Sequence, residues 1–139
     1  MISQAQAAFQ EALEHLKDLE AKHKGTDIEL NSLRLQAKCN LFQQKWEPAV
    51  EAYGRILSRS AALNKLNMKQ AEFLIKTINT LSGTQVKDYG VPVRIYKKFI
   101  SENPQHGLNP VILKLIRSFE LMQADKSQNN KPTQPQPAQ

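Results

Sequence analysis

The sequence is poor in the residues that interrupt helices or cross-link small folds. It has one cysteine, five glycines and seven prolines in 139 residues, and three of the prolines lie in the last eight positions. A single cysteine excludes an intramolecular disulfide, and scarce Gly and Pro leave long uninterrupted stretches that favour an all-helical fold. We expect Cys39 to be a buried structural thiol, because helical spacing places it among Leu35, Leu41 and Phe42.

Long apolar runs are also missing from the sequence. No stretch approaches the about 20 apolar residues that span a bilayer, so we expect no membrane insertion. The amino-terminal segment MISQAQAAFQ lacks the basic start and apolar centre of a signal peptide. Together with the lack of disulfides, these features favour a cytoplasmic location, with the nucleus as the alternative.

No group of residues has the composition of a catalytic or metal site. The three histidines, His15, His23 and His106, fall on different predicted elements without metal-ligand spacing. There is no glycine-rich phosphate loop, and no serine, histidine and acid can be combined into a triad. We therefore expect a non-enzymatic protein without metal or cofactor.

Positive charge is unevenly distributed along the chain. Residues 1–60 hold eight basic and eight acidic residues, whereas residues 61–139 hold eleven basic and five acidic residues and so carry the whole net charge of +6. This asymmetry is typical of a protein whose second half meets an acidic partner. A solvated basic face without a dedicated ligand explains the same counts equally well.

Apolar residues at helical spacing predict six helices. The second has apolar residues on two faces, with Ile28, Leu35, Cys39 and Phe42 on one of them, so we expect neighbours on both sides. SGT ends the fourth helix, and SRSAALNKLN is a polar connector that we expect to be helical in part. The polar segment 126–139 is a disordered tail after a domain of residues 1–125. The expected helices cover 2–23, 27–43, a stretch from residue 46, then 67–81, 88–104 and 109–123.

Two stretches of the sequence repeat the same pattern. KWEPAVEAYGRIL and DYGVPVRIYKKFI place an aromatic residue, a second aromatic residue and an apolar pair at matching positions 43 residues apart. Phe9 and Leu13 precede Tyr53 and Leu57 by 44 residues, so the first helix shares the pattern. Repeats of this length indicate helix pairs that bury their apolar sides by stacking on one another.

These stretches resemble the second helix of a tetratricopeptide repeat, which starts with an aromatic residue and has a small residue three positions later. The resemblance implies a short right-handed α-solenoid of about six antiparallel helices. Because the period exceeds the ~34 residues of that family and falls within the ~40–47 of HEAT-type pairs, a HEAT-like solenoid is the alternative. The matching positions are Trp46, Ala49, Tyr53 and Ile56, then Tyr89, Pro92, Tyr96, Phe99 and Pro104. At these positions we expect the aromatic residues to pack between helices.

The resemblance implies a protein–protein interaction module: an adaptor, a scaffold or a co-chaperone-like subunit. Family members bind a peptide or helix in a concave groove lined by the first helix of each pair, and some clamp a carboxylate with Lys, Asn and Arg. We expect the partner to present an acidic or amphipathic segment. Groove candidates are Arg34, Lys38, Asn31, Lys69, Lys76 and Asn79, and Arg94, Lys97 and Lys98 share one face of the fifth helix.

Two alternatives stay open at this point. If the basic faces of the last three helices adjoin, with Lys114 and Arg117 on the sixth, they form a stripe for nucleic acid or phosphate. The other alternative is a structural subunit, or a fragment of a longer helical-repeat protein, that oligomerises or joins a larger complex through residues 109–123.

Overall fold

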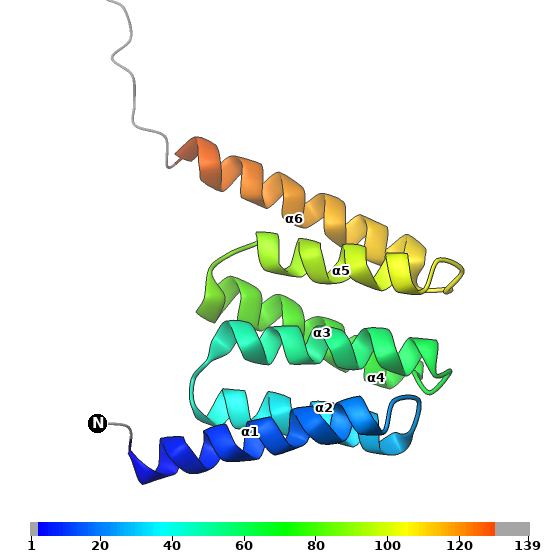
Figure 1. The fold of residues 1–139 in the computed structure, drawn as a ribbon. Helices are drawn as coiled ribbons and strands as arrows, with labels where there is room; N and C mark the ends of the chain where they lie inside the picture. Colours follow the sequence, from blue (N-terminus) through cyan, green and yellow to red (C-terminus); the bar gives the residue numbers. More distant parts are fainter. Residues whose placement is uncertain (1–2, 130–139) are drawn as a thin grey trace, which may run out of the picture.

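The computed structural model describes residues 3–129, and these residues form an all-helical fold without a β-strand (Figure 1). The all-α prediction is therefore confirmed. A short π-helical segment, η1, separates the fourth and fifth α-helices. The elements are α1 (Gln4–Lys22), α2 (Asp27–Phe42), α3 (Trp46–Ala62), α4 (Met68–Leu81), η1 (Ser82–Val86), α5 (Gly90–Glu102) and α6 (Asn109–Asn129).

Local polar residues define where several helices begin. Asn67 caps α4: its side chain accepts from the backbone N–H of Gln70, whose side chain accepts in return from the N–H of Asn67. Ser3 and Gln6 form the same reciprocal pair at the start of α1. In each pair, the two side chains accept hydrogen bonds from two backbone N–H groups that have no partner within the helix.

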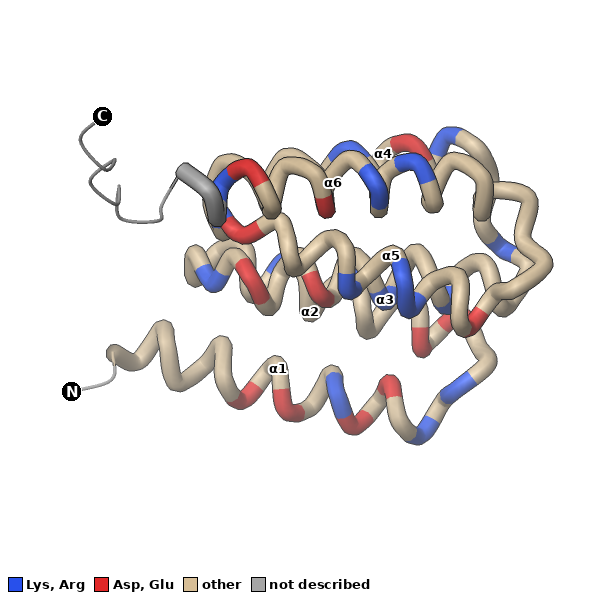
Figure 2. Tube along the Cα trace, turned by 90° about the horizontal axis from the view of Figure 1, so that it is seen from above, with Lys and Arg blue, Asp and Glu red and all other residues tan. Residues whose placement is uncertain are grey.

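Helix α3 has the most neighbours, because it contacts α2, α4 and α5. In Figure 1, α1 and α2 lie at one end of the molecule, α3 and α4 in the middle, and α5 and α6 at the other end. Seen from above, α1 lies along one edge and α4 and α6 along the other (Figure 2). The largest fully buried side chains are Tyr96, Phe99, Leu33, Leu57, Ile78 and Ile112, so the core runs through the whole stack.

The repeat positions that the sequence singled out contribute strongly to this core. Tyr96 is fully buried, and Tyr53 and Tyr89 are half-buried against the core cluster. The rings of Tyr89 and Tyr96 stack on Phe119 with centroids 5.7 and 6.4 Å apart. The prediction that these tyrosines pack between helices is confirmed, whereas Trp46 is half-buried outside that cluster.

Several boundaries differ from those predicted. The fourth helix does not end at SGT, because Ser82–Val86 continue it as a π-helical turn that stops at Lys87, whose φ of 59° is left-handed. The connector from residue 58, expected to be helical in part, belongs to α3 as far as Ala62. Helix α6 runs to Asn129, so residues 126–129 are helical rather than disordered. The rest of the predicted tail, residues 130–139, and the start of the first helix at Ile2 lie outside the described residues.

Helix α2 does lie between two neighbours, α1 and α3, as predicted, but the apolar face with Ile28, Leu35 and Phe42 is not covered by them. Ile28 and Leu35 are nearly half exposed and Phe42 is 78% exposed, with only the Phe9 ring stacked against it at 6.3 Å. The polar residues Glu29, Ser32, Gln36 and Asn40 of α2 are buried instead, and two of them bond to the neighbouring helices: Gln36 to Glu20 of α1 and Glu29 to Arg59 of α3. Cys39 is consequently half-buried rather than buried.

Candidate binding groove

A groove runs between α2 and α4, with α3 as its floor. Its two adjoining hollows have volumes of about 380 and 400 Å³ and share Phe73 of α4. We call this surface the α2–α4 groove. Its lining residues are Arg34, Lys38 and Leu41 from α2, Tyr53, Ile56 and Ser60 from α3, and Lys69, Gln70, Phe73, Leu74, Lys76, Thr77, Thr80 and Leu81 from α4.

The centre of the groove is apolar. Ile56 and Leu74 are buried beneath it, and the half-buried ring of Tyr53 lies beside them. Phe73 is 62% exposed, so its ring covers the floor without being packed into the core. An exposed aromatic ring beside buried aliphatic side chains is a surface that gains free energy when a partner covers it.

The rim of the groove is basic. Arg34, Lys38, Lys69 and Lys76 are all exposed, and within residues 3–129 none of them has a carboxylate within the 4.0 Å of an ion pair. Arg34 donates only to the amide oxygen of Asn31, at 2.9 Å. No lining residue is acidic. The structure thus places four of the seven predicted binding residues along this groove. Arg34, Lys38 and Lys69 line the hollow above Ile56 and Leu74, and Lys76 lines the adjoining hollow.

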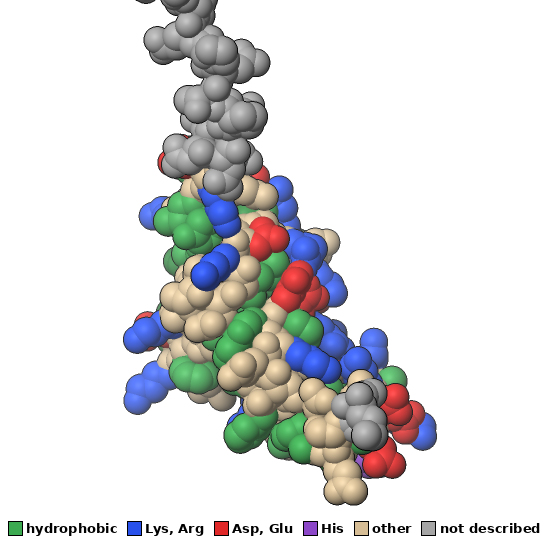
Figure 3. Space-filling model, turned by 90° about the vertical axis from the view of Figure 1, so that its left-hand side faces the viewer, with side chains coloured by type: hydrophobic (Ala, Val, Ile, Leu, Met, Phe, Trp, Pro, Cys, Tyr) green, Lys and Arg blue, Asp and Glu red, His purple; other side chains and the backbone are tan. Residues whose placement is uncertain are grey.

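The other three predicted cations are engaged in ion pairs elsewhere. Arg94 bonds Glu51 of α3, which with neighbouring Glu47 raises the pKa of the arginine. Lys97 lies 3.4 Å from Glu120 and Lys98 lies 3.8 Å from Glu102. In Figure 3 basic and acidic side chains mix along the right-hand edge of the molecule, whereas the left-hand edge shows mainly basic ones.

The predicted basic stripe over the last three helices is therefore divided. Lys69 and Lys76 of α4 line the α2–α4 groove, whereas Arg94 and Lys98 of α5 line the cavity described next. Lys97 shares a smaller hollow between α5 and α6 with Arg117, Glu120 and apolar residues.

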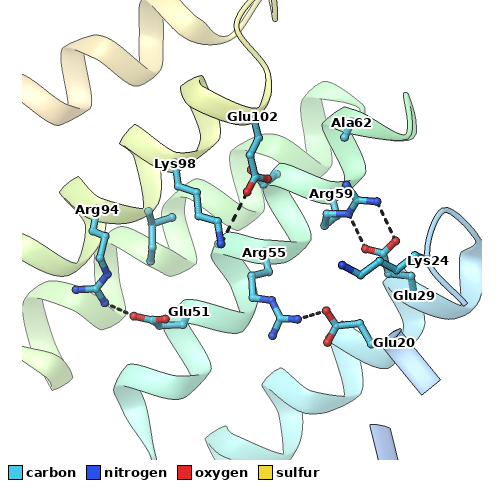
Figure 4. Close-up of a pocket in the computed structure, with 13 residues that line it drawn as sticks. Glu20, Lys24, Glu29, Glu51, Arg55, Arg59, Ala62, Arg94, Lys98 and Glu102 are labelled. Atoms are coloured by element: carbon cyan, nitrogen blue, oxygen red, sulfur yellow. Dashed lines mark hydrogen bonds and ion pairs between the residues drawn. The ribbon is translucent and has the colours of Figure 1, made fainter. Parts of the chain in front are cut away.

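A second large cavity, of about 610 Å³, lies over α3 between α1 and α5 and is lined by side chains of both charges (Figure 4). Arg59 donates from Nε and Nη2 to the two carboxylate oxygens of Glu29, at 2.6 and 3.1 Å. Arg55 bonds Glu20, whose other oxygen accepts from Gln36 at 3.0 Å. Each of these pairs joins α3 to a neighbouring helix.

The electrostatics of this cavity fit a structural role. Glu29 is only 1% exposed, and the hydrogen bonds from Arg59 and from the Gly25 N–H lower the pKa of its carboxyl against the opposing effect of burial. The same Glu29 raises the pKa of Arg59. Because its pKa is lowered and both oxygens already accept hydrogen bonds, this carboxylate is a poor general base. Sequence reasoning missed this cluster. Arg55 and Arg59, one helical turn apart, could have indicated a basic face on the third helix that pairs with acidic residues.

Two asparagines proposed for the groove are occupied by other bonds. Asn79 accepts a hydrogen bond from the hydroxyl of Tyr96 at 2.5 Å, and Asn31 accepts from Arg34. Burial raises the pKa of Tyr96 well above its ordinary value, so this hydroxyl stays protonated and donates to Asn79. The full set of a carboxylate clamp is therefore not assembled here.

Within residues 3–129, no helix combines the length and apolar character needed to cross a bilayer, and no three or more His, Cys, Asp or Glu side chains lie together as a metal-binding group. Comparison with protein-family models, curated proteins and solved structures returned no match for this chain. The similarity to tetratricopeptide repeats accordingly stays a prediction from the residues quoted above.

Proposed function

We propose that this chain is a non-enzymatic protein–protein interaction module that binds a segment of a partner protein in the α2–α4 groove. Its helices would form a short right-handed solenoid of antiparallel pairs, acting in the cytoplasm or nucleus as an adaptor or complex subunit. Two observations support this arrangement. Helix α3 contacts α2, α4 and α5, and the aromatic position of Tyr53 recurs 43 residues later at Tyr96.

One observation carries the binding proposal: four cations without carboxylate partners line an apolar groove that has no acidic lining residue. Other exposed cations are either paired with glutamates, as Arg94 and Lys97 are, or, like Lys17, lie outside this groove. Apolar burial on the floor would provide affinity, while the rim charges would orient the partner and raise the association rate.

Affinity capture from nuclease-treated lysate tests the proposal, with the unmodified chain compared with two variants. Phe73→Asp places a charge on the apolar floor, and because Phe73 is exposed, unchanged circular dichroism would assign lost binding to the groove rather than to unfolding. Lys17→Glu reverses an exposed charge on α1, which lies at the edge opposite α4 (Figure 2). Proteins retained by Lys17→Glu and lost with Phe73→Asp would support the groove. Equal recovery by both variants would exclude it.

A second candidate function has one observation in its favour. Phe73 is exposed on α4 between Lys69 and Lys76, and an aromatic ring beside cations is a platform for single-stranded nucleic acid. Binding to an oligonucleotide that falls by orders of magnitude between 50 and 200 mM salt would favour this candidate. Weak dependence on salt would favour the protein partner.

The structural-subunit alternative also remains a proposal. Helix α6 buries Ile112, Ile116 and Phe119 but leaves Leu121 and Met122 exposed at its C-terminal half. Light scattering tests it. A molar mass that rises with protein concentration in the unmodified chain, but stays that of one chain in a Leu121→Glu variant, would support self-association through residues 109–123.

A further inference from the structure

We infer that the α2–α4 groove selects an acidic amphipathic helix, rather than an extended peptide, with acidic side chains on both sides of an apolar ridge. This inference rests on the proposed function and specifies the partner of the same groove. The spacing of the rim cations and the position of the apolar floor between them carry it.

The two walls present their cations at helical intervals. Lys69 and Lys76 on α4 are seven residues apart, which places their Cα atoms about 10.5 Å apart along the helix axis. Arg34 and Lys38 on α2 are four residues apart, or about 6 Å. Phe73 lies on α4 between the two lysines and faces the floor that Ile56 and Leu74 complete.

A partner helix reproduces both intervals, because acids at i and i+7 are about 10.5 Å apart and acids at i and i+4 about 6 Å apart. Side chains on one face of a strand recur every ~6.6 Å, so the successive distances are about 6.6 and 13 Å. Measured between Cα atoms, a helix therefore matches both intervals, whereas a strand matches that of Arg34 and Lys38 and differs from that of Lys69 and Lys76 by about 3 Å.

The length and charge of the groove agree with a helix. Its α4 wall extends from Lys69 to Leu81, about 18 Å, which is the length of a helix of roughly three turns. Cations on both walls with an apolar floor between them complement an apolar ridge flanked by acids on both sides. A single nucleic-acid strand has one line of phosphates and would leave one wall without a partner.

An unbiased peptide selection tests this inference. A displayed library of random 16-residue peptides would be selected against the full chain, with the Phe73→Asp variant used to remove peptides that bind elsewhere. We expect enriched sequences with apolar residues at i, i+3, i+4 and i+7, acids on both flanks, and helical NMR shifts for the synthetic peptide in the bound state. Binders that stay extended or contain central prolines would overturn the helix inference and leave the groove function standing.

Charge reversal gives the second readout. The double variant Lys38→Glu/Lys69→Glu should weaken the selected acidic peptide by about tenfold or more, and a peptide with Lys in place of the acids that face these two positions should recover binding to that variant. The double variant Lys17→Glu/Lys87→Glu, which reverses two exposed charges outside the groove, serves as the matched control and should change affinity less than twofold. Unchanged affinity in the double variant would overturn the acidic-partner inference. A library that yields no peptide sensitive to Phe73→Asp would overturn the proposed function itself.

Discussion

Replacement of Gly54 by alanine tests how closely α3 and α5 pack. Gly54 is buried in the middle of α3, and an ideal Cβ there would lie 2.6 Å from Cγ2 and 3.1 Å from Cγ1 of Ile95 on α5. Both atoms are bonded directly to the branched Cβ of Ile95, so rotation of a flexible end cannot remove the overlap. The two helices approach so closely because residue 54 has no side chain.

Two effects oppose each other in Gly54→Ala. Alanine is favoured over glycine inside a helix by about 1 kcal/mol. Overpacking of a buried contact costs about 1–3 kcal/mol. We therefore expect a net loss of about 1 kcal/mol in the free energy of unfolding. When Ile95 is first replaced by alanine, all the overlapping atoms are gone, and the same Gly54→Ala change should instead stabilise by about 1 kcal/mol.

Urea unfolding followed by circular dichroism measures all four proteins of this cycle. With a urea slope of about 2 kcal/mol per molar, each expected change moves the midpoint by about 0.5 M. Gly83→Ala is the matched control, because the nearest atom to its ideal Cβ is 3.7 Å away and no loss of stability is expected. If Gly54→Ala were stabilising with Ile95 present, the close approach of α3 and α5 would be refuted, and with it the stacking of the repeats.

Three further predictions concern polar contacts. Glu29→Gln should destabilise by about 3 kcal/mol at pH 7, because it leaves Arg59 without its charged partner. The pKa of Glu29 is lowered in the folded protein, so the stabilisation by its ionised form is complete above the pKa of 4.5 in the unfolded chain and is lost as the pH falls through the folded-state pKa. The free energies of unfolding of the unmodified protein and of Glu29→Gln should therefore converge below pH 4.5. Tyr96→Phe should cost about 1 kcal/mol in thermal unfolding, because the amide of Asn79 loses its donor. Asn67→Ala should cost about 1 kcal/mol and increase hydrogen exchange in the first turn of α4, and unchanged exchange there would contradict the capping box.

The helices could be predicted because their signals are local. Scarce Gly and Pro and apolar spacing located all the α-helices that residues 3–129 form, though not the π-helical turn at 82–86. Asn67 and Pro110 marked helix starts that the structure places within one residue. The 43-residue repeat also identified Tyr96 as a packed position, because repetition of an aromatic residue reflects a repeated contact between helices.

Features that depend on the arrangement of the helices could not be predicted in the same way. The apolar residues Ile28, Leu35 and Phe42 have helical spacing, but spacing alone does not say whether a neighbour covers them. Arg59 and Glu29 are 30 residues apart, and only the packing of α3 on α2 brings them within 2.6 Å. The helical turns at 82–86 and 126–129 are polar, so their sequences lack the apolar period that would have predicted them.

The candidate site shows why net charge was an incomplete guide. The excess of basic residues lies in the second half of the sequence, yet Arg34 and Lys38 of the groove come from the half whose charges balance. Arg94, from the basic half, is paired with Glu51 of the balanced half. A cation contributes to recognition only if no carboxylate of the same fold satisfies it, and that depends on which helices adjoin. The predicted cations of α5 are therefore paired within the fold, whereas those of the α2–α4 groove are not, and it is for this groove that we propose an acidic partner.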